Sequence, residues 1–252
     1  MRKFYLLTAM GLLCAMLMHA QVSLTGATYT QDFNTLANTG TSAVLPTGWL
    51  LAESGTSANN NGLYAAGTGS SNAGDSYSFG AAASTERAFG GLLSGTLTPT
   101  IGAGFTNNTG GTITALTVTY TGEQWRLGAT ARFDRLDFQT SLDATSLTTG
   151  TWTDENNLDF VAPNSTGTVG AFDGNAVANR TSITYTITGL SLANGATIYF
   201  RWNDFNATGA DDGLAIDDFS ITPVSAGGGT NLSINDVTAV EGNSGTTSFT
   251  FT

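Results

Sequence analysis

The densest group of reactive side chains in this sequence is an acidic cluster in the segment 211–218. Its four members are Asp211, Asp212, Asp217 and Asp218. Carboxylates combined with backbone carbonyls are the ligands that Ca²⁺ prefers. Because side chains alternate along a strand, we expect Asp217 on the same face as Phe219 and Ile221, where a charge needs a partner. The cluster predicts a structural calcium site or, as the open alternative, acids that are solvated or paired with arginine and backbone N–H groups.

A second polar group lies in the middle of the chain, where Glu123, Trp125 and Arg126 occur within four residues. These three are the ligand-binding candidates, because an exposed indole can stack on a sugar ring between polar neighbours. The alternative is that Glu123 and Arg126 simply pair with each other. Most tryptophans of a β-sandwich fill its core, and Trp202 alternates with Phe200, which favours a buried position. The remaining tryptophans are Trp49 and Trp152.

The first twenty residues have the pattern of an export signal. Arg2 and Lys3 precede an apolar run that ends at Ala20, a small residue suited to signal peptidase. The run is short for a membrane-spanning helix, which needs about 20 apolar residues. We therefore expect cleavage near Ala20, no transmembrane span afterwards, and a secreted or cell-surface protein.

Removal of this segment restricts the chemistry of the remaining chain. It takes away the only lysine, the only cysteine (Cys14) and the only histidine (His19), and leaves six arginines against nineteen acidic residues. Without histidine or cysteine there is no conventional catalytic triad, thiolate nucleophile or structural zinc site. An acidic chain also repels phosphate backbones. The composition therefore predicts no catalytic residues and no nucleic-acid binding.

Short alternating runs between turn residues predict an all-β fold. Apart from the leader, no stretch of ten residues keeps a helical period. The length suits one antiparallel, jelly-roll-like β-sandwich. A glycine-rich segment, Ser54 to Gly74, reads as a long loop. The expected strands are Thr112 to Tyr120, Arg132 to Phe138, Ser182 to Thr188, Ala196 to Trp202 and Leu214 to Thr222.

The chain divides into four parts by composition. Residues 1–20 are the expected signal peptide, 21–224 the β-sandwich domain, 225–230 a glycine-rich linker, and 231–252 the first strands of a second module. About twenty residues cannot bury a core by themselves. The last part is therefore expected to be a fragment of a second β-sandwich.

Several motifs between residues 27 and 223 resemble those of an exported bacterial β-sandwich domain. They are the opening YTQDFNTL, the following LPTGW, the central YTGEQWR and the final strand GLAIDDFSIT. The final strand is also similar to that of jelly-roll carbohydrate-binding and MAM-type modules. That resemblance implies acids beside a structural calcium and brings no catalytic residue.

The stretch NLSINDVTAVEGNSGTTSFTF resembles the start of a Calx-beta domain. In that family, carboxylates from several loops hold calcium. Asp236 and Glu241 are the only matching acids here, and two acids cannot complete such a site.

The sequence favours a non-catalytic, exported adhesion or ligand-binding module, stabilised by calcium and directed at an extracellular glycan or protein surface. The alternative is an accessory domain of a secreted hydrolase, such as a nuclease, phosphatase or glycan hydrolase, with its catalytic domain beyond Thr252. Catalysis within residues 21–252 is a third reading, because two carboxylates can hydrolyse glycosides, but no pair is singled out.

Overall fold

The computed structural model describes residues 20–225 and shows an all-β sandwich of two sheets. The only helical elements among these residues are two three-residue 3₁₀ turns, η1 (Asn156–Leu158) and η2 (Val177–Asn179). In this part of the chain, no helix has the length and apolar character needed to cross a bilayer. The predicted fold class is confirmed.

The first sheet has seven strands, in the order β1-β8-β15-β10-β11, with β4 also paired to β8 and β12 to β10. Most of its pairs are antiparallel, but β1 runs parallel to β8. Alternation predicts strands but not their direction, so the sequence did not reveal this pair. The strands are β1 (Val22–Leu24), β4 (Trp49–Gly55), β8 (Leu97–Asn107), β10 (Arg135–Ser141), β11 (Thr153–Asp154), β12 (Phe160–Val161) and β15 (Thr197–Asp204).

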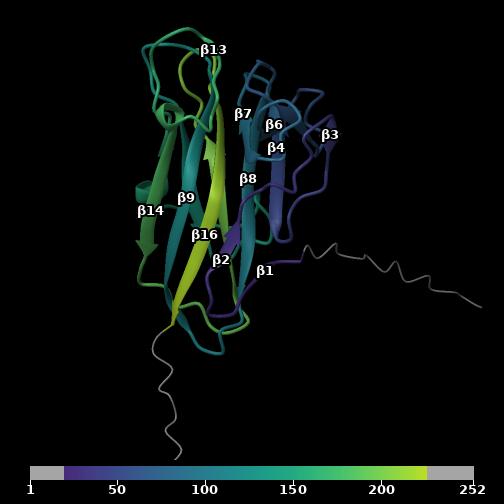
Figure 1. Ribbon diagram of the computed structural model, residues 1–252. Coiled ribbons are helices and arrows are strands. Elements are labelled where there is room, and N and C mark those ends of the chain that lie inside the picture. Colours follow the sequence, from purple (N-terminus) through teal and green to yellow (C-terminus); the bar gives the residue numbers. More distant parts are fainter. Residues whose placement is uncertain (1–19, 226–252) are drawn as a thin grey trace, which may run out of the picture.

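The second sheet has nine strands, in the order β13-β9-β16-β7-β6-β5-β3, with β14 also paired to β9 and β2 to β16. Figure 1 shows β9 and β16 side by side along much of the molecule. One pair, β5 with β6, is parallel. The strands are β2 (Tyr29–Gln31), β3 (Thr41–Ser42), β5 (Tyr64–Gly67), β6 (Asp75–Phe79), β7 (Ala88–Leu92), β9 (Ile113–Leu127), β13 (Gly170–Ala171), β14 (Arg180–Ile187) and β16 (Gly213–Ser225).

An aromatic core holds the two sheets together. Trp49 of β4 stacks on Trp202 of β15 with ring centroids 5.9 Å apart, and Phe219 of β16 packs edge-on against both. All three side chains are buried. Each buried aromatic side chain removes roughly 150–250 Å² from water, so this contact contributes strongly to packing between the sheets. The core assignment of Trp49 and Trp202 is confirmed.

The nine-stranded sheet also packs on its other face. A smaller cluster there contains Trp125, Phe79 and Ala215 together with neighbouring side chains of β6 and β7. Phe79 and Trp125 lie almost parallel, with centroids 6.0 Å apart. The central strands of this sheet are therefore buried on both faces.

The five strands expected from alternation are present as β9, β10, β14, β15 and β16, most of them longer than predicted. The segment Ser54 to Gly74 is not a continuous loop, because it contains the end of β4 and all of β5. Tyr64 fixes β5: its ring is fully buried, and its hydroxyl donates to the carbonyl of Val44 and accepts from the N–H of Ala37. The glycine-rich composition of the segment gave no indication that Tyr64 is buried.

Some expectations concern residues outside 20–225. These are the signal peptide, most of the glycine-rich linker and the Calx-beta-like segment with Asp236 and Glu241. They stay predictions.

Candidate functional site

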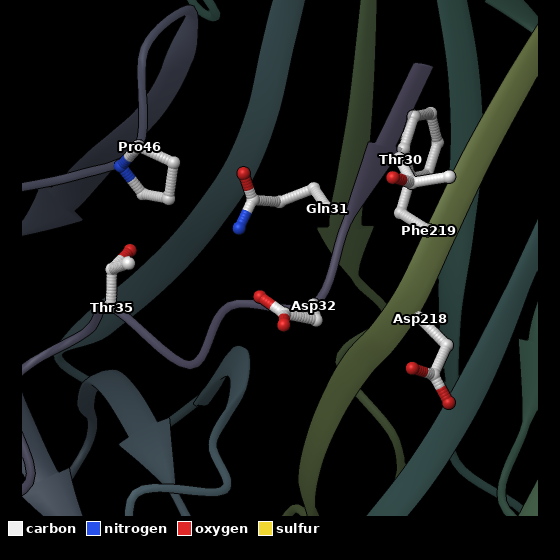
Figure 2. A pocket seen from close by; sticks show the side chains of 7 residues that line it. All are labelled: Thr30, Gln31, Asp32, Thr35, Pro46, Asp218 and Phe219. Atoms are coloured by element: carbon white, nitrogen blue, oxygen red, sulfur yellow. The ribbon is translucent and has the colours of Figure 1, made fainter. Parts of the chain in front are cut away.

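An open groove with a volume of about 540 Å³ lies beside β2 and β16. Figure 2 shows Gln31 extending from β2 toward Pro46, while the carboxylate of Asp218 points away from Gln31. Asp32 and Asp218 are exposed. The groove is lined by Thr30, Gln31, Asp32, Thr35, Pro46, Asp218 and Phe219.

A second hollow of about 500 Å³ shares Pro46 with the first and has a more apolar lining. It follows the segment 43–51, and the side chain of Val44 at its rim is 73% exposed. The two hollows together form what we call the Pro46 groove. A ligand in it meets hydroxyl, amide and carboxylate groups at one end and aliphatic surface at the other.

A β-bulge in β16 positions Asp217 and Asp218. Asp217 pairs with Thr121 of β9, but the next paired residue, Ser220, lies opposite Thr119, so β16 carries one extra residue here. Asp218 has a positive φ of 48°, as an extra residue in a bulge often does. The bulge reverses the expected alternation: Phe219 belongs to the core between the sheets. The prediction that Asp217 shares the face of Phe219 and Ile221 is therefore wrong.

Asp217 lies instead on the other face of the nine-stranded sheet, in a group of three carboxylates with Glu86 and Glu123. One oxygen of each lies within 4.8 Å of one oxygen of the others. Glu86 comes from the β6–β7 loop, Glu123 from β9 and Asp217 from β16. Asp217 and Glu123 are 6% and 1% exposed. We call this group the acid triad.

Each member of the acid triad is oriented by a donor from outside the group. The indole Nε1 of Trp125 donates to Oε2 of Glu123 at 2.8 Å. The backbone N–H of Asp218 donates to Oδ1 of Asp217 at 2.7 Å, and the amide of Asn175 donates to Oε2 of Glu86. The other oxygen of Glu123, Oε1, is buried and has no hydrogen-bond partner within residues 20–225. Oε1 of this buried carboxylate is therefore available to a further partner.

Burial and the neighbouring negative charges make two members of the acid triad, Glu123 and Asp217, difficult to ionise. Desolvation, opposed by the Asp218 N–H and reinforced by the Glu123 charge, raises the pKa of Asp217 to about 9. Desolvation, opposed by the Trp125 hydrogen bond, raises the pKa of Glu123 to about 7. In the absence of a cation, protons therefore compensate part of this charge near neutral pH.

Asp211 and Asp212 lie in a different network and already have protein partners. Asp211 accepts the backbone N–H of Ala207 at 2.9 Å. Asp212 accepts hydrogen bonds from Gln124 and from the backbone N–H of Gly128, and forms an ion pair with Arg132. These contacts match the alternative in which the acids are paired with arginine and backbone groups.

Two further carboxylates complete this network. Arg132 also forms an ion pair with Asp134, at 3.1 Å. Asp204 accepts the N–H of Leu93, and burial, reinforced by the charge of Asp134, raises its pKa well above the ordinary range. We therefore assign this group a structural role at the end of the sandwich.

The structure separates the three ligand-binding candidates of the central segment. Trp125 is 2% exposed and offers no face for stacking a ligand. Arg126 donates to the carbonyls of Gly69 and Ser70 and makes no ion pair with Glu123 among the described residues. The predicted Glu123–Arg126 pair is therefore wrong, because Trp125 and not Arg126 binds the carboxylate.

The sequence did not single out Glu86 or Gln31. Glu86 is about 37 residues from Glu123 and 131 from Asp217 in the chain, and only the sheet order β9-β16-β7 brings the three together. Gln31 belongs to YTQDFNTL, one of the motifs that resemble an exported β-sandwich domain. Nothing in that motif indicated that Gln31 would line a groove. Trp152, the remaining tryptophan, is half-buried with the guanidinium of Arg201 4.0 Å from its ring centre.

No protein-family model matches the sequence, and no curated protein matches it. Among solved structures, the chain is similar to the enzymatically active domain of tailspike protein 4 of bacteriophage CBA120 (10% identity, TM-score 0.38, covering 71% of this chain and 20% of that one). It is also similar to the CBM22-1 xylan-binding domain of Paenibacillus barcinonensis Xyn10C (10% identity, TM-score 0.37, covering 81% and 99%).

A third similar structure is the K3 cleaved adhesin domain of Lys-gingipain from Porphyromonas gingivalis (16% identity, TM-score 0.39, covering 70% of this chain and 92% of that one). The chain thus spans about a fifth of the tailspike chain but nearly the whole of the two smaller domains. With TM-scores below 0.5, these similarities assign neither a family nor a ligand to the chain.

Proposed function

We propose that this chain is a non-catalytic binding module of an exported protein, and that the Pro46 groove holds a neutral glycan. The observation that carries the proposal is the lining of the groove. Sugars present hydroxyl groups at their edges and C–H groups on their faces, so they suit a surface with polar groups at one end and Val44 and Pro46 at the other.

The polar end offers groups that can pair with hydroxyls. The side chain of Gln31 accepts a hydrogen bond from Tyr29 through its amide oxygen, and its amide nitrogen donates none within residues 20–225. Asp32 and Asp218 supply acceptors, and Thr35 supplies a hydroxyl. The carboxylates also repel anions, which favours a neutral ligand over an acidic polysaccharide or a phosphate.

The exposure of the groove carboxylates supports binding over hydrolysis. A glycosidase needs one carboxylic acid whose pKa is raised by an apolar or buried site, so that it can protonate the leaving group. Asp32 and Asp218 are both exposed to water. The groove therefore has acceptors for a sugar but lacks a buried acid. Binding of this kind suits an adhesion module and equally an accessory domain of a secreted hydrolase.

The test is affinity electrophoresis of the full chain in gels that contain xylan, galactan, mannan, a β-glucan or polygalacturonate. We expect at least one neutral polysaccharide to slow migration and the acidic polygalacturonate to have no effect. Gln31→Ala removes a donor and an acceptor, each worth about 1 kcal/mol, and should weaken binding about tenfold or more.

Ser182→Ala, an exposed hydroxyl of β14, is the matched control and should leave migration unchanged. Normal migration of the wild-type chain in all the neutral gels would contradict the proposal. If the Gln31→Ala variant were slowed as much as the wild-type chain, the polysaccharide would bind outside the groove. The experiment is repeated in chelator, so that its outcome is independent of any metal.

A further inference from the structure

A second feature, separate from the Pro46 groove, points to a cation. We propose that the acid triad of Glu86, Glu123 and Asp217 binds one Ca²⁺ on the face of the nine-stranded sheet that turns away from the main core. The site is different from the one expected from sequence, because it excludes Asp211 and Asp212 and includes Glu86. It would hold a loop and two strands together.

The first line of support is the arrangement of oxygens. One oxygen of each carboxylate is held by a donor outside the triad, namely Asn175, Trp125 or the backbone N–H of Asp218. Such outer donors fix the orientation of carboxylate ligands in metal sites. Within residues 20–225, Oε1 of Glu123 is buried and receives no hydrogen bond. One carboxylate oxygen from each of three segments lies within 4.8 Å of the others.

The second line of support is the buried oxygen of Glu123. A carboxylate that is 1% exposed normally finds a hydrogen-bond donor for each oxygen, since an unpaired buried acceptor is costly. Oε1 of Glu123 has none among the described residues. It lies in a group whose other members are also carboxylates, which cannot donate unless they are protonated. A bound cation would satisfy it.

The third line of support is the balance of charge. The ion pairs in the described part of the chain use Arg132 and Arg135, and none reaches the acid triad. Arg87, next to Glu86, is 1% exposed and donates to Ser78, Gly67 and Ala81. Arg180, opposite Glu123 on β14, is exposed and attracts Glu123 only from beyond ion-pair distance. The triad therefore lacks a paired positive group.

The ligand type and spacing favour calcium over magnesium or a transition metal. All three donors are carboxylate oxygens, and no histidine or cysteine occurs after residue 20. Calcium binds oxygen at about 2.3–2.6 Å, so it can bridge oxygens separated by up to about 5 Å. Magnesium, at about 2.0–2.1 Å, needs opposite ligands to approach within about 4 Å and demands near-octahedral order. Separations of up to 4.8 Å suit the larger ion without rearrangement.

The experiment is calorimetric titration of the full chain, stripped with chelator, with calcium chloride at about pH 7.5. We expect one Ca²⁺ per chain. Glu123→Gln and Asp217→Asn each remove one ligand and should weaken binding by about tenfold or more.

Two matched controls change the same charge nearby. Asp218→Asn removes a carboxylate beside Asp217 but leaves the backbone donor in place, and should change affinity by less than about threefold. Asp212→Asn tests the arginine-paired network and should also retain binding. Loss of binding in Asp212→Asn, with binding retained in Glu123→Gln, would place calcium elsewhere and overturn the proposal.

The fold of the variants is checked by melting in chelator. Both ligand substitutions keep the side-chain shape, so the variants should melt close to the wild-type temperature in chelator and should gain less from calcium than the wild-type chain does. The wild-type chain should melt higher in calcium than in chelator. Superimposable wild-type melting curves, together with no heat of binding, would overturn the proposal without affecting the groove.

Discussion

At the scale of single residues, the distinctive property of this chain is the number of carboxylates held away from water. Asp204 and the acid triad lie in separate places, yet desolvation is the first cause of the raised pKa for Asp204, Glu123 and Asp217 alike. Because the pKa values of these acids are raised in the folded protein, its stability should depend on pH. The direction of that sensitivity follows from the pKa values.

We expect the metal-free protein to lose stability as the pH rises from about 6 to about 9. The folded pKa values of Glu123 and Asp217, about 7 and about 9, lie above those of the unfolded chain. The contribution of these two groups to the stability of the fold is therefore complete below about pH 4. It is lost as the pH rises through their pKa values in the folded protein. The charge of Arg180 lowers the pKa of Glu123, whereas the charges of Asp218 and Glu86 raise the pKa of both groups.

Melting temperatures in chelator across this range give the measurement. Asp217→Asn should flatten the profile, because it removes the group with the highest pKa. Calcium should flatten it in the wild-type chain, because the cation compensates the charge that the protons leave behind. A melting temperature that rises from about pH 6 to about pH 9 in chelator would contradict this account.

At the scale of elements, the bulge in β16 decides which way the acids face. Asp218, with φ of 48°, occupies the left-handed region that favours glycine, asparagine and aspartate. Because of the extra residue, Asp217 and Phe219 face opposite sides of the sheet, and Asp218 lies at the Pro46 groove. A single backbone irregularity thus serves both proposed sites.

Substitutions at Asp218 should report this backbone requirement. We expect Asp218→Gly to be neutral or slightly stabilising, and Asp218→Val to cost about 1–2 kcal/mol, because a β-branched residue resists positive φ. Chemical denaturation of the two variants gives the free energies of unfolding. Ser182→Val, at an exposed position in the regular strand β14, is the control that should not show the same penalty, since valine suits extended backbone.

How far the sequence predicted these elements depended on whether the signal was local. Alternation located the long strands, and the pairing of Trp202 with Phe200 at alternate positions correctly placed both in the core. The bulge was not predictable, because one extra residue leaves no mark on composition. Nor was the meeting of Glu86 with Asp217, which depends on strand order. The buried tyrosine in β5 was hidden by the glycines around it.

At the scale of the whole molecule, the nine-stranded sheet contributes residues to both proposed sites, the Pro46 groove and the acid triad. It separates the main core from the smaller cluster around Trp125, and it carries the acid triad on one face and the edge of the Pro46 groove at the bulge. Trp125, which orients Glu123, belongs to the smaller of these two clusters. The metal site should therefore be less stable than the fold that carries it.

The placement of the arginines also determines how the folded protein withstands proteases. No lysine follows residue 20, and all six later arginines lie within the described residues. Arg180 is the only exposed one; Arg87 is buried, and the other four are partly buried. Since Arg180 begins β14 and is paired with β9, trypsin must first free an edge strand before it can cut.

We expect trypsin to leave the folded region of residues 20–225 intact or to cut it only after Arg180, as mass spectrometry of a timed digest would show. Early cleavage after Arg87 or Arg126 would contradict the burial of these side chains. The exported protein proposed above would meet trypsin-like proteases without the protection of a cell. Because five of the six arginines within residues 20–225 are buried or partly buried, this part of the chain offers such enzymes a single exposed site.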